Sequence, residues 1–232
     1  MNICENLKTI RTIYADLNGN GSKEKIILTG TPLEKDDTYM TSLQLIIDSE
    51  FSEKKIFNLE DSGSEFDIFS VNVTPLKGQE ILLIGNYNKE GYFGTIKILR
   101  YEDKSIKLIF DSENFSKNIK YSMRYLDDYN IEITCDNTNE KYILDIDNIQ
   151  KNYIVNEYGQ YLENSIYRND IIYTIDNVFP VKLENNDYYS LMIQQGFRLK
   201  DTTDKLGGIQ TLIDINTLDD IAIIDQYLIK MS

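Results

Sequence analysis

The residues best suited to chemistry form one short polar stretch near the N-terminus, which reads DLNGNGSKE from Asp16 to Glu24. Side-chain oxygens stand at its positions 1, 3, 5 and 9, and a backbone carbonyl is available at Ser22. Such oxygens can surround a cation of calcium's radius and coordination number. An EF-hand would need a glutamate at position 12, which here is Ile27, so we expect this loop to join two strands.

A simpler interpretation of the same stretch stays open. Asparagine and glycine are the usual residues of polar hairpin turns, and the two glycines, Gly19 and Gly21, permit positive φ angles. The loop is therefore either a calcium site or an empty turn. If it binds calcium, we expect a weak structural site, because only Asp16 and Glu24 carry a formal charge.

Composition narrows the kinds of partner. The chain has 24 Lys and Arg residues against 38 Asp and Glu residues, which gives a formal net charge of -14. That charge repels nucleic acids and anionic lipids and favours cations, although it also serves solubility alone. Histidine is absent, which removes the commonest acid/base group and transition-metal ligand. We expect a hard metal if any, no nucleic acid partner and no catalytic centre.

The N-terminal sequence and the two cysteines do not determine the cellular location of the protein. No stretch approaches the roughly 18 apolar residues of a membrane helix, and MNICENLKTIR has no hydrophobic signal core. We expect no membrane insertion. A calcium loop favours an extracellular or cell-surface protein, whereas the missing signal leaves the cytoplasm open. Cys4 and Cys135 can form at most one disulfide.

Short alternating or β-branched runs dominate the chain, and no window has a long amphipathic helical pattern. The sequence predicts an all-β fold, with a short helix at 158–164 as the one uncertain exception. We expect strands at 8–15, 25–29, 41–48, 54–59, 66–73, 80–85, 94–101, 105–110, 119–125, 130–135, 142–146, 177–183, 189–194, 209–215 and 221–229.

The loop and its flanking strands recur along the chain. IYADLNGNGSKEKIILTG aligns with FSVNVTPLKGQEILLIG, which places Asp16 on Asn72 and Glu24 on Glu80, an offset of 56 both times (72 minus 16 and 80 minus 24). A third copy, FPVKLENNDYYSLMIQQG, puts other side chains at positions 1, 3, 5 and 9: Lys182, Glu184, Asn186 and Ser190. Each copy ends its second strand at a glycine: Gly30, Gly85 and Gly196.

The repeats predict the architecture. Two more strands follow each copy, so the unit is a four-stranded antiparallel meander, and about four units fall at 8–60, 66–112, 119–156 and 176–230 of a single domain, 1–232. A meander has two open edges and cannot bury both faces alone, so the units must pack on one another. Radial closure into a β-propeller-like array is the usual solution, and an open arc or a β-sandwich is the alternative.

The phrase ADLNGNGSKEKIIL resembles the FG-GAP and VCBS-type repeats of integrin-like β-propellers, which carry a DxNxDGxxD loop between the first two strands of a blade. The resemblance covers roughly residues 11–30. It implies a calcium site in which Ser22 gives its backbone oxygen and the side-chain ligands are Asp16, Asn18, Asn20 and Glu24. The other copies depart from the pattern at Leu76 and Lys182, so we expect neither to bind calcium.

The same resemblance implies a non-catalytic binding or scaffold protein, which uses the loops after the second strands to recognise a protein or a glycan. Aromatic residues on or near these loops are candidates for such contacts, although packing between repeats would also explain them. They are Tyr39, Tyr87, Tyr92, Phe93 and Phe197.

Two other functions remain as alternatives. A carbohydrate-active enzyme would need paired carboxylates, and the candidates include three adjacent aspartate pairs: Asp36 with Asp37, Asp127 with Asp128, and Asp219 with Asp220. Neighbouring residues on a strand point to opposite faces, so adjacency does not by itself make an acid/base couple. The other alternative is a structural component of a surface or spore.

Overall fold

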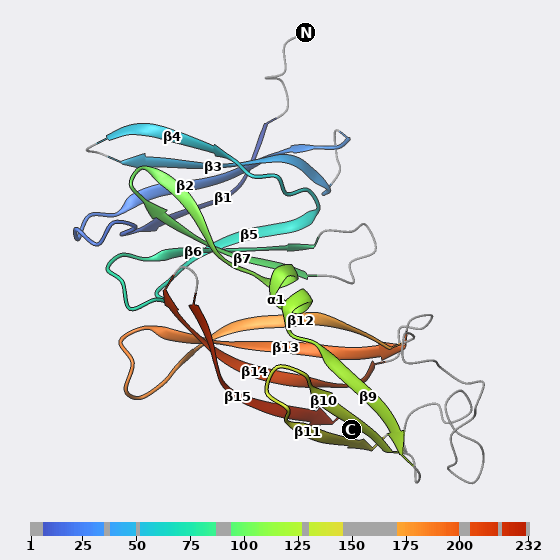
Figure 1. Cartoon of the computed structure of the whole chain (residues 1–232). Coiled ribbons are helices and arrows are strands. Elements are labelled where there is room, and N and C mark those ends of the chain that lie inside the picture. Colours follow the sequence, from blue (N-terminus) through green and yellow to red (C-terminus); the bar gives the residue numbers. More distant parts are fainter. Residues whose placement is uncertain are drawn as a thin grey trace. The chain divides into compact units, whose positions relative to one another are not determined.

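A computed structural model of the chain describes residues 7–34, 38–49, 52–86, 94–126, 130–145, 171–199, 205–217 and 220–230. In these ranges the fold is all-β apart from one short helix, and the strands form four antiparallel sheets (Figure 1). Each sheet consists of strands that follow one another in the sequence. None of the described helical residues forms a helix long and apolar enough to cross a membrane.

The first two sheets are four-stranded meanders. Sheet one has the order β1-β2-β3-β4, from β1 (Lys8–Ala15), β2 (Glu24–Pro32), β3 (Met40–Ser49) and β4 (Ser52–Asn58). Sheet two has the order β5-β6-β7-β8, from β5 (Ser64–Val71), β6 (Glu80–Asn86), β7 (Gly94–Glu102) and β8 (Ser105–Asp111). The helix α1 (Ser112–Asn118) follows directly.

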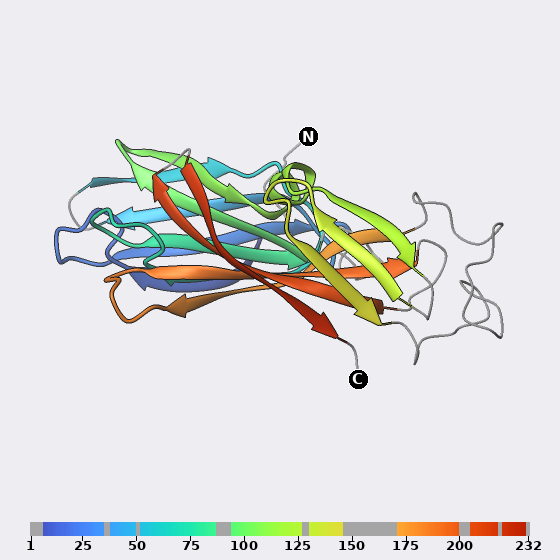
Figure 2. The ribbon, with the colours of Figure 1, turned by 60° about the horizontal axis from the view of Figure 1, so that its bottom comes forward.

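The other two sheets complete the described chain. One has three strands in the order β11-β10-β9, from β9 (Tyr121–Leu126), β10 (Asn130–Cys135) and β11 (Lys141–Asp145). The last has the order β12-β13-β14-β15, from β12 (Ile171–Lys182), β13 (Tyr189–Leu199), β14 (Lys205–Thr217) and β15 (Asp220–Lys230). Figure 2 shows the long β14–β15 pair along its whole length.

The chain divides into two compact units. Unit 1 consists of Met1–Ser112, Phe179–Leu191 and Ile213–Ala222, and unit 2 of Glu113–Val178, Met192–Leu212 and Ile223–Ser232. The strands of the last sheet therefore contribute to both units. Each unit has its own cluster of buried apolar side chains.

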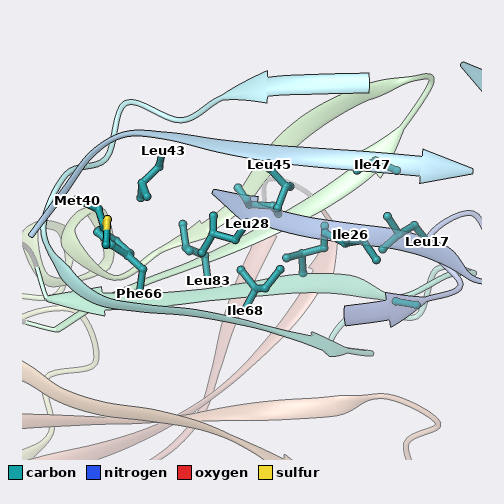
Figure 3. Close-up of a cluster of buried hydrophobic side chains, with 13 residues drawn as sticks. Leu17, Ile26, Leu28, Met40, Leu43, Leu45, Ile47, Phe66, Ile68 and Leu83 are labelled. Atoms are coloured by element: carbon teal, nitrogen blue, oxygen red, sulfur yellow. The ribbon is translucent and has the colours of Figure 1, made fainter. Parts of the chain in front are cut away.

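The core of unit 1 comes from the alternation of apolar residues along its strands. In β2, Ile26 and Leu28 are fully buried while the alternate residues Lys25 and Ile27 are partly exposed, as expected for a strand with one buried face. Side chains of β2 and β3 point toward those of β5 and β6 (Figure 3). The cluster contains Ala15, Leu17, Ile26, Leu28, Met40, Leu43, Leu45, Ile47, Phe66, Ile68, Ile81, Leu83 and Leu99.

The expectation that the second strands end at the recurring glycines is wrong, because β2, β6 and β13 continue past them to Pro32, Asn86 and Leu199. Each glycine instead makes room for a neighbouring side chain. A Cβ atom at Gly85 would lie 2.3 Å from the Phe66 ring, and one at Gly196 would lie 2.4 Å from the Asp176 carboxylate. At Gly30 the nearest atom, 2.8 Å away, belongs to a leucine of β3. The recurring glycine thus leaves space for a side chain in each of these three copies.

Unit 2 has a second core. Its buried members are Met123, Ile131, Ile133, Leu144, Phe197, Leu206 and Ile209. Tyr121 and Phe197 meet edge to face, with ring centroids 5.4 Å apart. The Tyr121 hydroxyl donates to Gln195 Oε1 at 2.9 Å, which anchors the polar end of that ring. Cys135 is buried in this unit, and Cys4 lies outside the described residues.

The predicted all-β class with antiparallel meanders is confirmed. Three sheets have the expected four strands, and the described part of the third has three. Helix α1 was not expected from the sequence, and β12 begins at Ile171 rather than at residue 177. The helix expected at 158–164 lies outside the described residues.

Candidate metal site

The loop from Asp16 to Glu24 joins β1 to β2, as the sequence analysis predicted. Ala15 and Glu24 are partners in the antiparallel register, so the loop closes a hairpin. Gly19 and Gly21 have φ angles of 71° and 88°. These are left-handed conformations, and they explain why glycine stands at both positions.

Backbone N–H groups hold the oxygens at positions 1, 3 and 5 inside the loop. The Asp16 carboxylate accepts the N–H of Gly21 at 2.8 Å and that of Asn20 at 3.1 Å. Asn18 Oδ1 accepts the same Asn20 N–H at 3.0 Å, and Asn20 Oδ1 accepts the N–H of Ser22 at 2.7 Å. Each oxygen keeps a further lone pair, so the loop arranges potential ligands without using up their capacity.

Glu24 closes the loop from its buried side. Its side chain is 2% exposed, Oε2 accepts the N–H of Leu17 at 2.9 Å, and Oε1 accepts Asn18 Nδ2 at 2.6 Å. Across the described part of the chain, no lysine or arginine forms an ion pair with this carboxylate. A buried carboxylate without a cation is costly, so this group is a natural attachment point for one.

The second repeat has the same closure. Glu80 is fully buried, its Oε2 accepts the N–H of Val73 at 3.0 Å, and its Oε1 accepts the Thr74 hydroxyl at 2.7 Å. These contacts join positions 9, 2 and 3 of the loop, the positions that Glu24 joins in the first repeat. The two loops are therefore equivalent in structure as well as in sequence.

Unlike Glu24, Glu80 has a cation. Arg100 Nη1 lies 2.5 Å from Glu80 Oε1, and Nη2 donates to the carbonyl oxygen of Lys77 at 2.7 Å. Arg100 is itself 6% exposed, and its Nε has no hydrogen-bond partner. A buried guanidinium and a buried carboxylate thus neutralise each other in the second repeat.

The third copy has neither the buried position 9 glutamate nor an arginine paired with it. Ser190 replaces the glutamate, and its hydroxyl hydrogen-bonds to the Asp214 carboxylate on β14. Lys182, at position 1, places its ammonium 5.4 Å from the centre of the Tyr189 ring. The copy has no buried carboxylate at position 9.

The first two loops pack on each other within unit 1. Gln79 donates its N–H to Asp16 O at 2.7 Å, and Gln79 Oε1 accepts the Asp16 N–H at 3.1 Å. A Cβ atom at Gly78, where φ is 90°, would lie 2.4 Å from Leu17 O. This contact between distant segments was missed by the sequence analysis, although the extra glycine at 78 was a signal for a close approach.

A hollow of about 530 Å³ opens beside the first loop. Asn18, Asn20 and Glu24 line it, together with Ser49 at the end of β3. The wall from the second repeat consists of Leu76, Lys77, Arg100, Tyr101, Glu102, Asp103 and Lys104. Burial raises the pKa of Tyr101, and the Glu24 carboxylate raises it further.

The donor set of the first loop fits a hard cation such as calcium. It offers two carboxylates, two side-chain amides and backbone carbonyls, with no nitrogen or sulfur ligand. Within the described ranges, no group of three or more Cys, Asp or Glu side chains is arranged so that it could hold a metal ion. A site in this loop would therefore depend on amide and carbonyl oxygens as well as on Asp16 and Glu24.

The other candidate residues are only partly described. Tyr39 is partly buried, with its hydroxyl 3.4 Å from Ser62 Oγ. Phe197 is fully buried in the unit 2 core, which gives its ring a packing role. Asp220 is exposed at the start of β15. Candidates outside the described residues are Tyr87, Tyr92, Phe93, Asp36, Asp37, Asp127, Asp128 and Asp219.

Comparisons with known proteins concern mainly the second half of the chain. Residues 119–229 match the family described as the YybI C-terminal domain, a range that contains β9 to β14 and nearly all of β15. The chain is also similar to the uncharacterized protein YybI of Bacillus subtilis (strain 168), with 21% identity over 202 residues. That alignment covers 87% of this chain and 77% of YybI. The chain thus resembles YybI along most of its length, while the family match begins after the two loops described above.

Proposed function

We propose that the chain is a non-catalytic binding or scaffold protein whose first repeat is stabilised by a calcium ion in the loop from Asp16 to Glu24. One observation carries the proposal: Glu24 is buried like Glu80 but lacks the guanidinium that Glu80 has. We therefore expect the first loop to bind a cation from solution, which would balance the charge of Glu24. Oxygen ligands at positions 1, 3, 5 and 9 select a hard one.

The ion would have a structural role. Glu24 and Asp16 lie at the two ends of the loop, so an ion that contacts both would hold β1 and β2 together at this end of the hairpin. Calcium would stabilise the folded state by linkage, because the unfolded loop does not gather the same oxygens. Two formal charges suggest an affinity in the extracellular range, about 10⁻⁴ to 10⁻³ M, which favours an extracellular or cell-surface location.

The repeated meanders support a propeller-like array as the scaffold. The strand order is the simple consecutive one in each sheet, and the first two repeats share their loop closure in detail. Such an array presents loops as a recognition surface for a protein or a glycan. The absence of histidine from the sequence agrees with a non-catalytic protein.

Equilibrium dialysis against calcium tests the metal directly. We expect one ion per chain, lost in Asp16→Ala and retained in Asn72→Ala, the matched change at position 1 of the second loop. A parent protein that binds no calcium would refute the metal site. A glycan array with and without calcium tests the partner class: binding to a defined glycan supports a lectin, and turnover of a glycan would contradict the non-catalytic proposal.

A further inference from the structure

We infer that the Arg100 guanidinium serves the second repeat as a cation, in the position that a metal ion would occupy in the first repeat. At the matching position the first repeat has Ser49, whose small side chain leaves room for an ion beside Glu24. The part concerning calcium rests on the proposed function. The part concerning Arg100 and Ser49 rests on the contacts of the two loops alone.

The strand registers make Ser49 and Arg100 equivalent. Lys25 pairs with Asp48 between β2 and β3, and Ile81 pairs with Leu99 between β6 and β7. Extended by one residue, these registers set Ser49 across from Glu24 and Arg100 across from Glu80, and Arg100 does contact the Glu80 carboxylate. Directly opposed residues of an antiparallel pair share a face of the sheet. Each position 9 glutamate pairs with an apolar residue of the first strand, Ala15 or Val71, and on the side of the third strand its neighbour is arginine in the second repeat and serine in the first.

The Arg100 guanidinium contacts the same kinds of oxygen that a metal in such a loop would contact. It meets the position 9 carboxylate of Glu80, the carbonyl of Lys77 at position 6 and, at 3.4 Å, the Thr74 hydroxyl at position 3. A guanidinium is always charged and has five N–H donors in a fixed plane. It can thus satisfy a carboxylate and a carbonyl together, without an ion from solution.

The first repeat has a hollow beside Glu24, and Arg100 of the second repeat is part of its wall. Ser49 and Glu24 line the same hollow of about 530 Å³, with Asn18 and Asn20 beside them. The Ser49 side chain is short and uncharged, so it supplies no cation to Glu24. The first two repeats therefore differ in the source of their cation. In the second repeat it is a side chain of the protein, Arg100, and in the first repeat it is an ion from solution.

The inference predicts that an arginine at position 49 replaces the external ion. Ser49→Arg should unfold at a temperature several degrees above the parent in EDTA, and its calcium affinity should fall at least tenfold. Ser49→Met, the matched control, fills the hollow without charge and should show no such gain. Adding Glu24→Gln to Ser49→Arg should remove the gain, because the carboxylate partner is gone.

Two results would overturn the inference: Ser49→Arg that is no more stable than Ser49→Met in EDTA, or Ser49→Arg that binds calcium as the parent does. If the parent protein does not bind calcium, the proposed function fails. The comparison of Ser49→Arg with Ser49→Met in EDTA still decides the inference. The second repeat gives a test that does not depend on position 49. Arg100→Met should destabilise the fold strongly and Glu80→Gln should restore part of the loss; additive effects of the two changes would contradict a cation role for Arg100.

Discussion

Glu24 and Glu80 occupy the same place in successive repeats, yet in the described structure only Glu80 has a cation against its carboxylate. Both side chains are almost completely buried and accept the N–H of position 2 of their loops. The difference between them separates what the chain supplies for itself from what we propose it takes from solution.

The two glutamates should respond differently to neutralisation. Glu80→Gln leaves the buried Arg100 guanidinium without its counter-charge, and breaking such a pair costs about 3–5 kcal/mol. Glu24→Gln breaks no ion pair in calcium-free buffer, so its cost should be about 1 kcal/mol, typical of one hydrogen bond. Urea unfolding in EDTA measures both free energies. Equal losses would show that Glu24 already has a cationic partner within the chain.

Contact between the two loops can be tested with a matched pair of glycines. Gly21 and Gly78 have φ angles of 88° and 90°, so alanine is similarly strained at both. A Cβ atom at Gly78 would lie 2.4 Å from Leu17 O, whereas at Gly21 nothing lies within 4 Å. Gly78→Ala should therefore cost about 1–3 kcal/mol more than Gly21→Ala in urea unfolding. Equal costs would mean that the loops do not pack on each other.

Acid stability should depend on Asp176 in unit 2. Its carboxylate lies 2.9 Å from Arg198 Nη2 and 2.5 Å from Lys205 Nζ. Burial alone would raise the pKa of Asp176, but hydrogen bonds from Lys205 and Arg198 outweigh it and lower the pKa below its ordinary value. The ionised Asp176 carboxylate therefore stabilises the fold fully above the pKa of aspartate in the unfolded chain, about 3.9. This stabilisation is lost as the pH falls through the pKa of Asp176 in the folded protein.

Urea unfolding of the parent and Asp176→Asn between pH 2 and pH 6 checks this sign. The parent should lose its advantage over the variant toward the acid end of the range. An advantage that grows as the solution becomes more acidic would contradict a lowered pKa for Asp176.

Charge in the first loop should set calcium affinity. Asn20→Asp adds a third carboxylate among the proposed ligands, so calorimetric titration should show tighter calcium binding than in the parent. In the second loop, Asn72→Asp adds a carboxylate at position 1, outside the lining of the hollow, and it should leave calcium affinity unchanged because the Arg100 guanidinium already balances Glu80. Tighter binding in both variants would indicate a general effect of negative charge.

The sequence predicted the all-β class, the antiparallel meanders and the hairpin loop because all three depend on local patterns. The limits of β1 and β10 match the expected ranges, and the offset of 56 correctly paired Glu24 with Glu80. The role of Arg100 could not be read in the same way, because it depends on the cross-strand register of β6 and β7. Likewise, Phe197 was expected near a loop, but β13 continues to Leu199 and buries the ring.

Thermal unfolding of the parent across calcium concentrations from 10⁻⁵ to 10⁻² M tests the central claim most directly. With a dissociation constant of about 10⁻³ M, linkage gives about 1.4 kcal/mol at 10⁻² M calcium. For a chain of this size the melting temperature should rise by about 3–5 °C. Magnesium should give a smaller rise because it requires a smaller, octahedral shell, and Asp16→Ala should abolish the calcium effect. A melting temperature that is the same in EDTA and in 10⁻² M calcium would show that the Asp16–Glu24 loop is only a turn.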